Sequence, residues 1–234
     1  MAQYGELNNM SNKNIVITLP DGTSIDKPAG ITGLEIAEGI SMGLAKQSIL
    51  IEVNGQLRDL SYQIFEDSKI NILKKDADVA LETIRHDCAH IMAEAVQDLF
   101  PGTQVTIGPA IDNGFYYDFA FKKPFVSDDI NKIEKRMIEI IEKDTPFIRE
   151  IWDRDEAIAY FEKAGELYKS QIIKDLPKDE QISIYKQGDW LDLCRGPHLP
   201  STKHIGTSFK LMKVAGAYWR GDENNEMLTR IYGT

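Results

Sequence analysis

The chain has 234 residues, of which 42% are hydrophobic and 27% are charged. These proportions are those of a globular protein and exclude a disordered chain. Two cysteines are too few for a disulfide scaffold. A net charge of −10 argues against a general nucleic-acid binder, because such proteins usually carry a basic excess. The sequence shows no signal peptide and no run of roughly 20 apolar residues, so we expect a cytoplasmic protein without a membrane partner.

The N-terminal part of the chain has the pattern of a small domain built around one helix. Residues 1–12 are polar and lack periodicity, which predicts a flexible tail. Apolar residues alternate over residues 15–19, and a Pro-Asp-Gly turn leads into a second predicted strand. Thr32 and Glu35 have the spacing of a capping box at a helix start. Further strands follow, one ending in an Asn-Gly turn, so we predict a β-grasp domain at residues 13–75.

The rest of the chain, residues 76–234, predicts a larger domain of mixed helices and strands, so the fold class is α+β. A long helix is expected over residues 79–100, followed by a glycine-rich β segment. Further helices are expected from Ser127 and over residues 154–163. A hairpin around Gln187-Gly188 then leads into the loop CRGPHLP.

Histidine and cysteine fall into two spaced pairs in this second region. His86 and His90 share a face of the predicted helix, away from the centre of its apolar stripe. Cys194 and His198 bracket an Arg-Gly-Pro loop. The four groups could hold Zn²⁺ or line a metal-free hydrolytic pocket in which imidazoles polarise a water. Asp192 points the same way as Cys194 if the strand continues. The simpler alternatives are a solvated helix face for the two helix histidines and a surface carboxylate for Asp192.

Several motifs, in this order, resemble those of bacterial threonyl-tRNA synthetases: HDCAH, IGPAIDNGFYYDF, GELYKSQI, DLCRGPHLP and FKLMKVAGAYWRGDENNEMLTRIYGT. The resemblance extends over the chain after its tail. It implies that residues 13–75 form a TGS domain and residues 76–234 an editing domain. In that family the aminoacylation and anticodon-binding domains follow, so we expect the chain, which stops at IYGT, to be an N-terminal fragment.

The resemblance also implies a reaction. The family ligates L-threonine to tRNA(Thr) with ATP and must reject serine, which lacks one methyl group. One methyl group is worth only about 1–3 kcal/mol in a binding pocket. The fragment is therefore expected to hydrolyse mischarged seryl-tRNA(Thr), and its expected partner is the tRNA(Thr) acceptor end that carries serine.

Site residues are implied by the same motifs. His86 is expected to activate water, Asp192 to orient the water or the substrate amine, and Lys169 to stabilise developing charge. Without the resemblance, Lys169 would be interpreted as a solvated lysine at a helix end. The residues expected to bind substrate are His90, Tyr117, Cys194 and His198.

Near the C-terminus, basic residues alternate with aromatic ones in a way typical of an RNA-binding surface. Residues 201–234 hold five basic and three acidic residues. Aromatic core residues with basic neighbours at the edge explain the pattern equally well. The residues expected to contact tRNA are Lys210, Lys213 and Arg220, beside Phe209, Tyr218 and Trp219.

We expect no required metal or other cofactor in this fragment; ATP, Mg²⁺ and Zn²⁺ are expected for the aminoacylation domain alone. If a metal binds, its expected ligands are His86, His90, Cys194 and His198. One alternative is a zinc-dependent editor of the alanine type. Another is a non-catalytic tRNA-binding or regulatory fragment with a structural zinc site, which predicts unfolding on chelation. The fragment is expected to be monomeric, and the full synthetase a homodimer.

Overall fold

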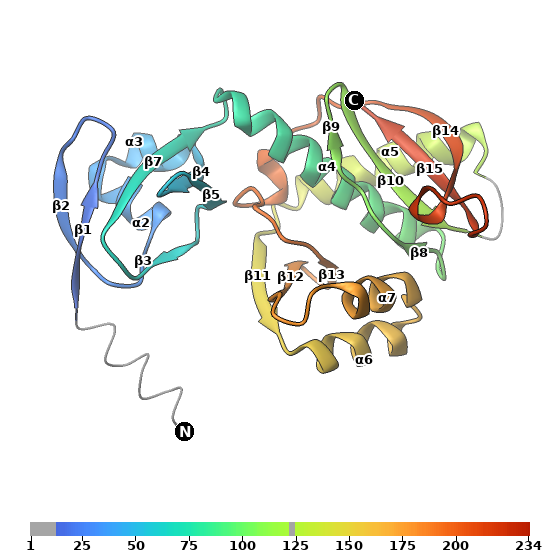
Figure 1. Ribbon diagram of the computed structural model, residues 1–234. Helices are drawn as coiled ribbons and strands as arrows, with labels where there is room; N and C mark the ends of the chain where they lie inside the picture. Colours follow the sequence, from blue (N-terminus) through green and yellow to red (C-terminus); the bar gives the residue numbers. More distant parts are fainter. Residues whose placement is uncertain (1–12, 122–124) are drawn as a thin grey trace. The chain divides into compact units, whose positions relative to one another are not determined.

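The computed structural model describes residues 13–121 and 125–234 (Figure 1). The predicted tail at residues 1–12 lies outside the described residues. The described chain divides into two compact units. The first holds residues 13–81 together with residues 196–200, and the second holds residues 82–195 together with residues 201–234. Within the described ranges, no helix has the length and apolar character needed to cross a membrane.

The first unit is a five-stranded sheet in the order β2-β1-β7-β4-β5. Its strands are β1 (Asn14–Thr18), β2 (Ser24–Pro28), β4 (Ser48–Val53), β5 (Gln56–Asp59) and β7 (Ser68–Lys74). Strands β1 and β7 are parallel, and the other pairs are antiparallel. The remaining elements are α2 (Gly33–Ile40), α3 (Met42–Gln47) and the short pair β3 (Ile31–Thr32) and β6 (Gln63–Ile64). The predicted β-grasp fold is confirmed.

The predicted patterns explain how this unit forms. Alternation in β1 turns Ile15 and Ile17 into the core, where they join Ile36 of α2 in one hydrophobic cluster. Helix α2 begins with the predicted capping box. The Thr32 hydroxyl accepts from the backbone N–H of Glu35 at 3.3 Å, and the Glu35 carboxylate accepts from the backbone N–H of Thr32 at 2.8 Å.

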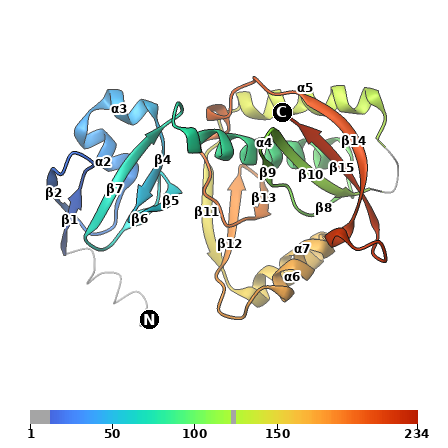
Figure 2. The same ribbon diagram turned by 45° about the horizontal axis from the view of Figure 1, so that its top comes forward.

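The second unit contains two antiparallel sheets and four helices among its described residues (Figure 2). The larger sheet has the order β14-β15-β10-β8, with β9 paired to β10, and the smaller has the order β11-β12-β13. The strands are β8 (Gln104–Val105), β9 (Ala110–Ile111), β10 (Gly114–Ala120), β11 (Phe147–Trp152), β12 (Ile182–Gln187), β13 (Trp190–Leu193), β14 (Leu211–Tyr218) and β15 (Met227–Gly233). The helices are α4 (Asp78–Leu99), which starts in the first unit, α5 (Ser127–Glu142), α6 (Arg154–Ala164) and α7 (Leu167–Asp175); single 3₁₀ turns, η1 (Thr202–His204) and η2 (Trp219–Gly221), complete the unit.

In the second unit too, the core is formed by apolar residues that alternate along strands or recur at helical spacing. Phe115, Tyr117 and Phe119 of β10 point inward, and each is at most 1% exposed. The periodic apolar face of α5 is buried, with Ile133 and Met137 fully covered. Figure 2 shows α4 and α5 along one face of the larger sheet.

The sequence did not predict α7 as a helix. Its buried residues are Lys169, Ser170 and Ile173, so two of its three inward side chains are polar. A helix whose buried face is polar lacks the apolar stripe on which prediction from periodicity depends. The polar face of α7 is part of the candidate site.

The capping box supplies a test of the first unit. Replacing Thr32 with alanine removes the oxygen that accepts from the Glu35 N–H, so we expect the free energy of unfolding of this unit to fall by about 1 kcal/mol. Urea unfolding followed by amide hydrogen exchange in peptides from residues 13–75 measures the change. Thr32→Ser keeps the hydroxyl and should match the wild type, and equal stability of Thr32→Ala would show that the box does not stabilise α2.

Candidate active site

Helix α4 and strand β13 present their polar side chains to each other. His90 Nδ1 lies 3.2 Å from Asp192 Oδ2, and His86 Nε2 lies 3.1 Å from Cys194 Sγ. The two histidines are one helical turn apart, and Asp192 and Cys194 are two residues apart along an extended chain. Both spacings therefore turn their side chains to one side, as the sequence predicted.

The same helix and hairpin carry further polar contacts that the sequence analysis missed. Trp190 donates its indole N–H to Gln97 Oε1 at 2.7 Å, and its ring lies edge-on to His90 with centroids 6.0 Å apart. Gln187 donates to Glu94 at 2.5 Å. A signal existed, because Trp190 precedes Asp192 by two residues and Glu94 follows His90 by one helical turn. Neither residue could be assigned to the site from the sequence, because the sequence does not show that α4 lies beside the hairpin of β12 and β13.

Asp192 is the centre of the site. It is 1% exposed and lies against three donors. Lys169 Nζ is 2.5 Å from Oδ1, the Tyr117 hydroxyl donates to Oδ2 at 2.7 Å, and His90 is the third donor. Lys169 also donates to the Tyr117 hydroxyl at 2.9 Å. The simpler alternatives, a surface carboxylate and a solvated lysine, are therefore wrong, since Lys169 is only 3% exposed.

Charge and burial fix the protonation of this group. Burial alone raises the pKa of Asp192, but the positive charge of Lys169 and the hydrogen bond from His90 outweigh it and hold that pKa well below its usual range. Burial, reinforced by the negative charge of Asp192, raises the pKa of Tyr117 well above its ordinary value. At neutral pH the centre is thus a carboxylate that accepts from an ammonium group and an un-ionised phenol.

The carboxylate also orients His90. Since Asp192 can only accept, the His90 nitrogen that faces it, Nδ1, carries a proton. The rings of His86 and His90 meet edge-on, with centroids 4.7 Å apart. Ligand atoms of these two residues and Cys194 lie within 4.8 Å of one another. Two imidazole nitrogens and a thiol are a donor set that suits Zn²⁺.

His198, the fourth member of the predicted cluster, lies in the segment of residues 196–200 that groups with the first unit. It is 1% exposed, and its backbone N–H donates to Asp59 Oδ1 at 2.7 Å. Cys88, between the two histidines in sequence, is 3% exposed on the apolar side of α4, as its helical position predicted.

The basic residues predicted to contact tRNA are engaged within the second unit. Lys210 pairs with Glu134 at 2.6 Å, and Arg220 pairs with Asp175. Lys213 Nζ lies 4.7 Å from the centroid of the Tyr232 ring. Two of the three cations thus already have carboxylate partners. Of the aromatic residues between them, Trp219 is buried at 7% exposed and Tyr218 is 41% exposed.

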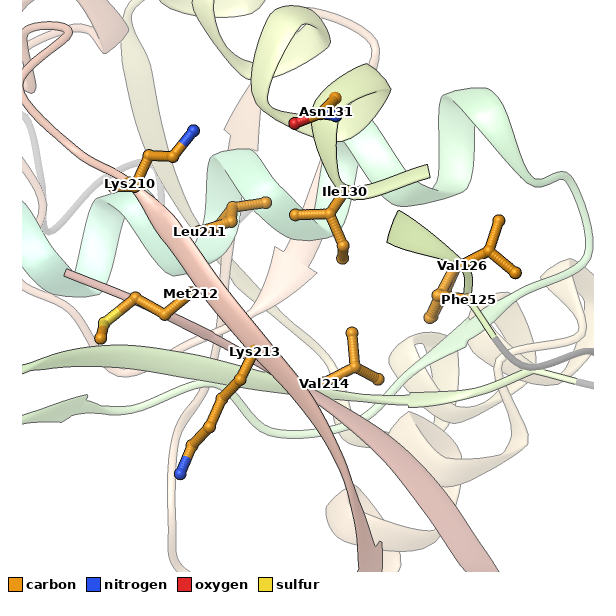
Figure 3. A pocket seen from close by; sticks show the side chains of 9 residues that line it. All are labelled: Phe125, Val126, Ile130, Asn131, Lys210, Leu211, Met212, Lys213 and Val214. Atoms are coloured by element: carbon orange, nitrogen blue, oxygen red, sulfur yellow. The ribbon is translucent and has the colours of Figure 1, made fainter. Parts of the chain in front are cut away.

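Two of these lysines border a groove between β14 and the start of α5, with a volume of about 390 Å³ (Figure 3). None of the residues predicted to be catalytic lines it. Its lining is mainly apolar and consists of Phe125, Val126, Ile130, Asn131, Lys210, Leu211, Met212, Lys213 and Val214.

Comparison with known proteins assigns the chain to a family. Residues 15–74 match the TGS domain, and residues 182–232 match the "Threonyl and Alanyl tRNA synthetase second additional domain". The threonine–tRNA ligases of Rhodospirillum rubrum and Pelagibacter ubique are 57% and 60% identical to the chain over 94% of its length. That of Phenylobacterium zucineum is 60% identical over 220 residues. The chain is an N-terminal region of the threonyl-tRNA synthetase family.

The chain spans about a third of the length of these synthetases, 34% for Rhodospirillum rubrum. The predicted resemblance is confirmed, as are the TGS domain and the editing-type domain. The second match includes β13 with Asp192, Cys194 directly after that strand, and the strands β14 and β15. Lys169 and the histidines of α4 lie before the matched residues, so the candidate site is assembled from both sides of that boundary.

The buried ion pair at the centre of the candidate site supplies a test. Lys169→Met leaves the Asp192 charge buried without its cation, so we expect the free energy of unfolding at pH 7 to fall by about 3–5 kcal/mol. The double variant Lys169→Met, Asp192→Leu should lose less than the single variant, because no charge stays buried. Urea unfolding measures both. Lys174→Gln, which breaks an exposed ion pair between α7 and Glu162 of α6, should resemble the wild type. A double variant less stable than the single one would contradict the account.

Proposed function

We propose that residues 76–234 form a proofreading domain that hydrolyses the ester of mischarged seryl-tRNA(Thr). The longer protein to which this region corresponds would ligate L-threonine to tRNA(Thr) with ATP. The observation that carries the proposal is the buried group of Lys169, Asp192 and Tyr117 beside His86, His90 and Cys194. Burying a charged pair almost fully costs folding free energy, so its presence supports a functional role. The pair also lies next to groups that can accept or donate a proton.

Ester hydrolysis needs a positioned water, a proton acceptor and a donor toward the developing negative charge. His86, which is half-buried, would take a proton from the water as its oxygen attacks the seryl carbonyl carbon. As the tetrahedral intermediate collapses, the bond to the ribose oxygen breaks, and the proton passes to that oxygen. The products are free serine and tRNA(Thr).

Lys169 would stabilise the oxyanion. An ammonium group has three N–H donors. Two of them go to Asp192 and Tyr117, and the third finds no acceptor among the described residues. Asp192 was predicted to orient water or the substrate amine; with three donors around it, we now propose that it acts by fixing Lys169, Tyr117 and His90.

The remaining site residues would bind the seryl group and the terminal ribose: His90, Tyr117, Cys194 and His198. Discrimination would be steric, since a site closed around serine excludes threonine by its extra methyl group. Steric exclusion of threonine from a small pocket discriminates better than the binding energy that one extra methyl group contributes in a larger pocket. Of the three basic residues predicted to contact tRNA, we propose Lys213 as the contact, because Lys210 and Arg220 already pair with carboxylates.

We propose that hydrolysis needs no bound metal and that ATP, Mg²⁺ and Zn²⁺ serve the aminoacylation step of the longer synthetase. The proposed setting is the cytoplasm, with the tRNA(Thr) acceptor end as partner. We further propose a monomeric fragment and a dimeric synthetase.

One second candidate has a specific observation in its favour. The nitrogen and sulfur donors of His86, His90 and Cys194 suit Zn²⁺, so a zinc-dependent editor of the alanine type is the alternative. A structural zinc site in a non-catalytic fragment is less well supported, because such a site has no use for the buried pair of Lys169 and Asp192.

Hydrolysis of purified seryl-tRNA(Thr) and threonyl-tRNA(Thr) by this chain, with and without a chelator, tests the proposal. We expect loss of the seryl ester, survival of the threonyl ester and no effect of the chelator. His86→Ala should slow hydrolysis by about 10²–10⁴-fold, the usual contribution of a general base. His204→Ala, at a partly exposed histidine in η1, is the matched control and should hydrolyse normally.

Each other outcome overturns part of the proposal. Loss of hydrolysis on chelation favours the zinc-dependent editor, and loss of folding on chelation favours the structural zinc site. A folded chain that hydrolyses neither ester would contradict autonomous editing by this region. Normal hydrolysis by His86→Ala would remove His86 from the mechanism.

A further inference from the structure

The turn between β14 and β15, residues 219–226, lies against α7 (Figure 2). We call this turn the clasp. Its residue Trp219 meets Tyr168 of α7 edge-on, with ring centroids 5.0 Å apart. The Tyr168 hydroxyl donates to the carboxylate of Glu226, and burial together with this bond raises the pKa of Tyr168 to about 12. The first turn of α7 is thus held by an edge-on ring contact and a hydrogen bond.

The clasp also reaches the other end of the helix. Arg220 donates to Asp175, the last residue of α7. Arg220 has a φ of 58°, in the left-handed region that costs a residue with a side chain about 1–2 kcal/mol. Its guanidinium also lies 5.2 Å from the centroid of the Trp219 ring. An unfavourable backbone conformation persists where surrounding contacts determine it, and here those contacts join the clasp to α7.

Packing, rather than a hydrogen bond, holds the Trp219 ring. It is 7% exposed, and its indole N–H has no acceptor in the described part of the chain. Buried tryptophans usually satisfy this donor. The contact with Tyr168 and the cation above the ring are therefore the interactions that fix its place.

We propose that the clasp sets the position of α7 and, through it, of Lys169. The inference rests on the proposed function, in which Lys169 stabilises the transition state. Lys169 follows Tyr168 directly, and its ammonium group must meet Asp192 at 2.5 Å and Tyr117 at 2.9 Å together. A displacement of about 1 Å can cost a catalyst about 100-fold in rate. Tyr168, Trp219 and Arg220 are positioning residues, not contacts to RNA.

The double variant Tyr168→Phe, Arg220→Gln deletes both polar contacts of the clasp and keeps both rings. Trp219→Ala deletes the edge-on ring contact. For hydrolysis of seryl-tRNA(Thr) we expect kcat to fall roughly threefold to tenfold in the double variant and about 100-fold in Trp219→Ala. KM should not change. Lys174→Gln, which breaks the exposed pair of α7 with Glu162, is the matched control and should keep wild-type kcat.

A second measurement does not depend on activity. Lys169 is almost fully buried, so acetic anhydride should acetylate it slowly in the wild type and in Lys174→Gln, as read by peptide mass spectrometry. The clasp variants should acetylate it roughly tenfold faster, because opening of α7 exposes the amine. If Trp219→Ala does not fold, Tyr168→Phe, Arg220→Gln still tests the positioning role, because it keeps both rings.

The two readouts separate the possible failures. A wild type without hydrolysis, combined with faster acetylation in the clasp variants, would overturn the proposed function and support the positioning role. Unchanged kcat with Lys169 still protected would overturn the positioning role. A raised KM with unchanged kcat and a protected Lys169 would show that these residues bind RNA instead.

Discussion

The buried ion pair of Lys169 and Asp192 is the interaction on which the candidate site depends. Taking two charges out of water is costly, and the cost is recovered only when the geometry is good and the remaining donors and acceptors are satisfied. Here the Tyr117 hydroxyl bridges the two charges and His90 supplies a third donor to the carboxylate. Four elements, α4, β10, α7 and β13, therefore meet at this one point.

This constraint explains features that lie outside the site itself. A Cβ at Gly108 would lie 2.1 Å from the Tyr117 ring, so the glycine of the IGPA motif leaves the room that the tyrosine needs. Glu166, just before α7, accepts from Gln97 and from the backbone N–H of Val105, and burial raises its pKa. Gln97 in turn accepts from Trp190. The ends of α7 are thus tied down both by this chain of hydrogen bonds and by the turn between β14 and β15.

The sequence predicted the parts of this arrangement that follow from local periodicity. The shared faces of His86 with His90 and of Asp192 with Cys194 follow from helical and strand geometry, and the structure bears them out. Lys169 was different, because only the family resemblance pointed to it. Its helix buries polar residues and has no apolar stripe to predict it.

Ion pairs between residues distant in sequence could not be predicted. The interpretation of Arg220 as an RNA contact could not take Asp175 into account, since nothing local connects a turn near the C-terminus with the end of α7. The same holds for Lys210 and Glu134. A basic and aromatic pattern alone cannot distinguish a solvent-facing surface from a turn that packs within the domain.

The most direct test of the account is the protonation of His90, read by ¹⁵N NMR of the histidine ring nitrogens in the whole chain at neutral pH. If the Asp192 carboxylate organises the site, Nδ1 of His90 has the shift of a protonated nitrogen. Asp192→Leu, which removes the acceptor, should abolish this preference, while His204 should keep its signals. A proton on Nε2 with Nδ1 bare in the wild type would contradict the account, because Asp192 would then face a nitrogen with nothing to donate.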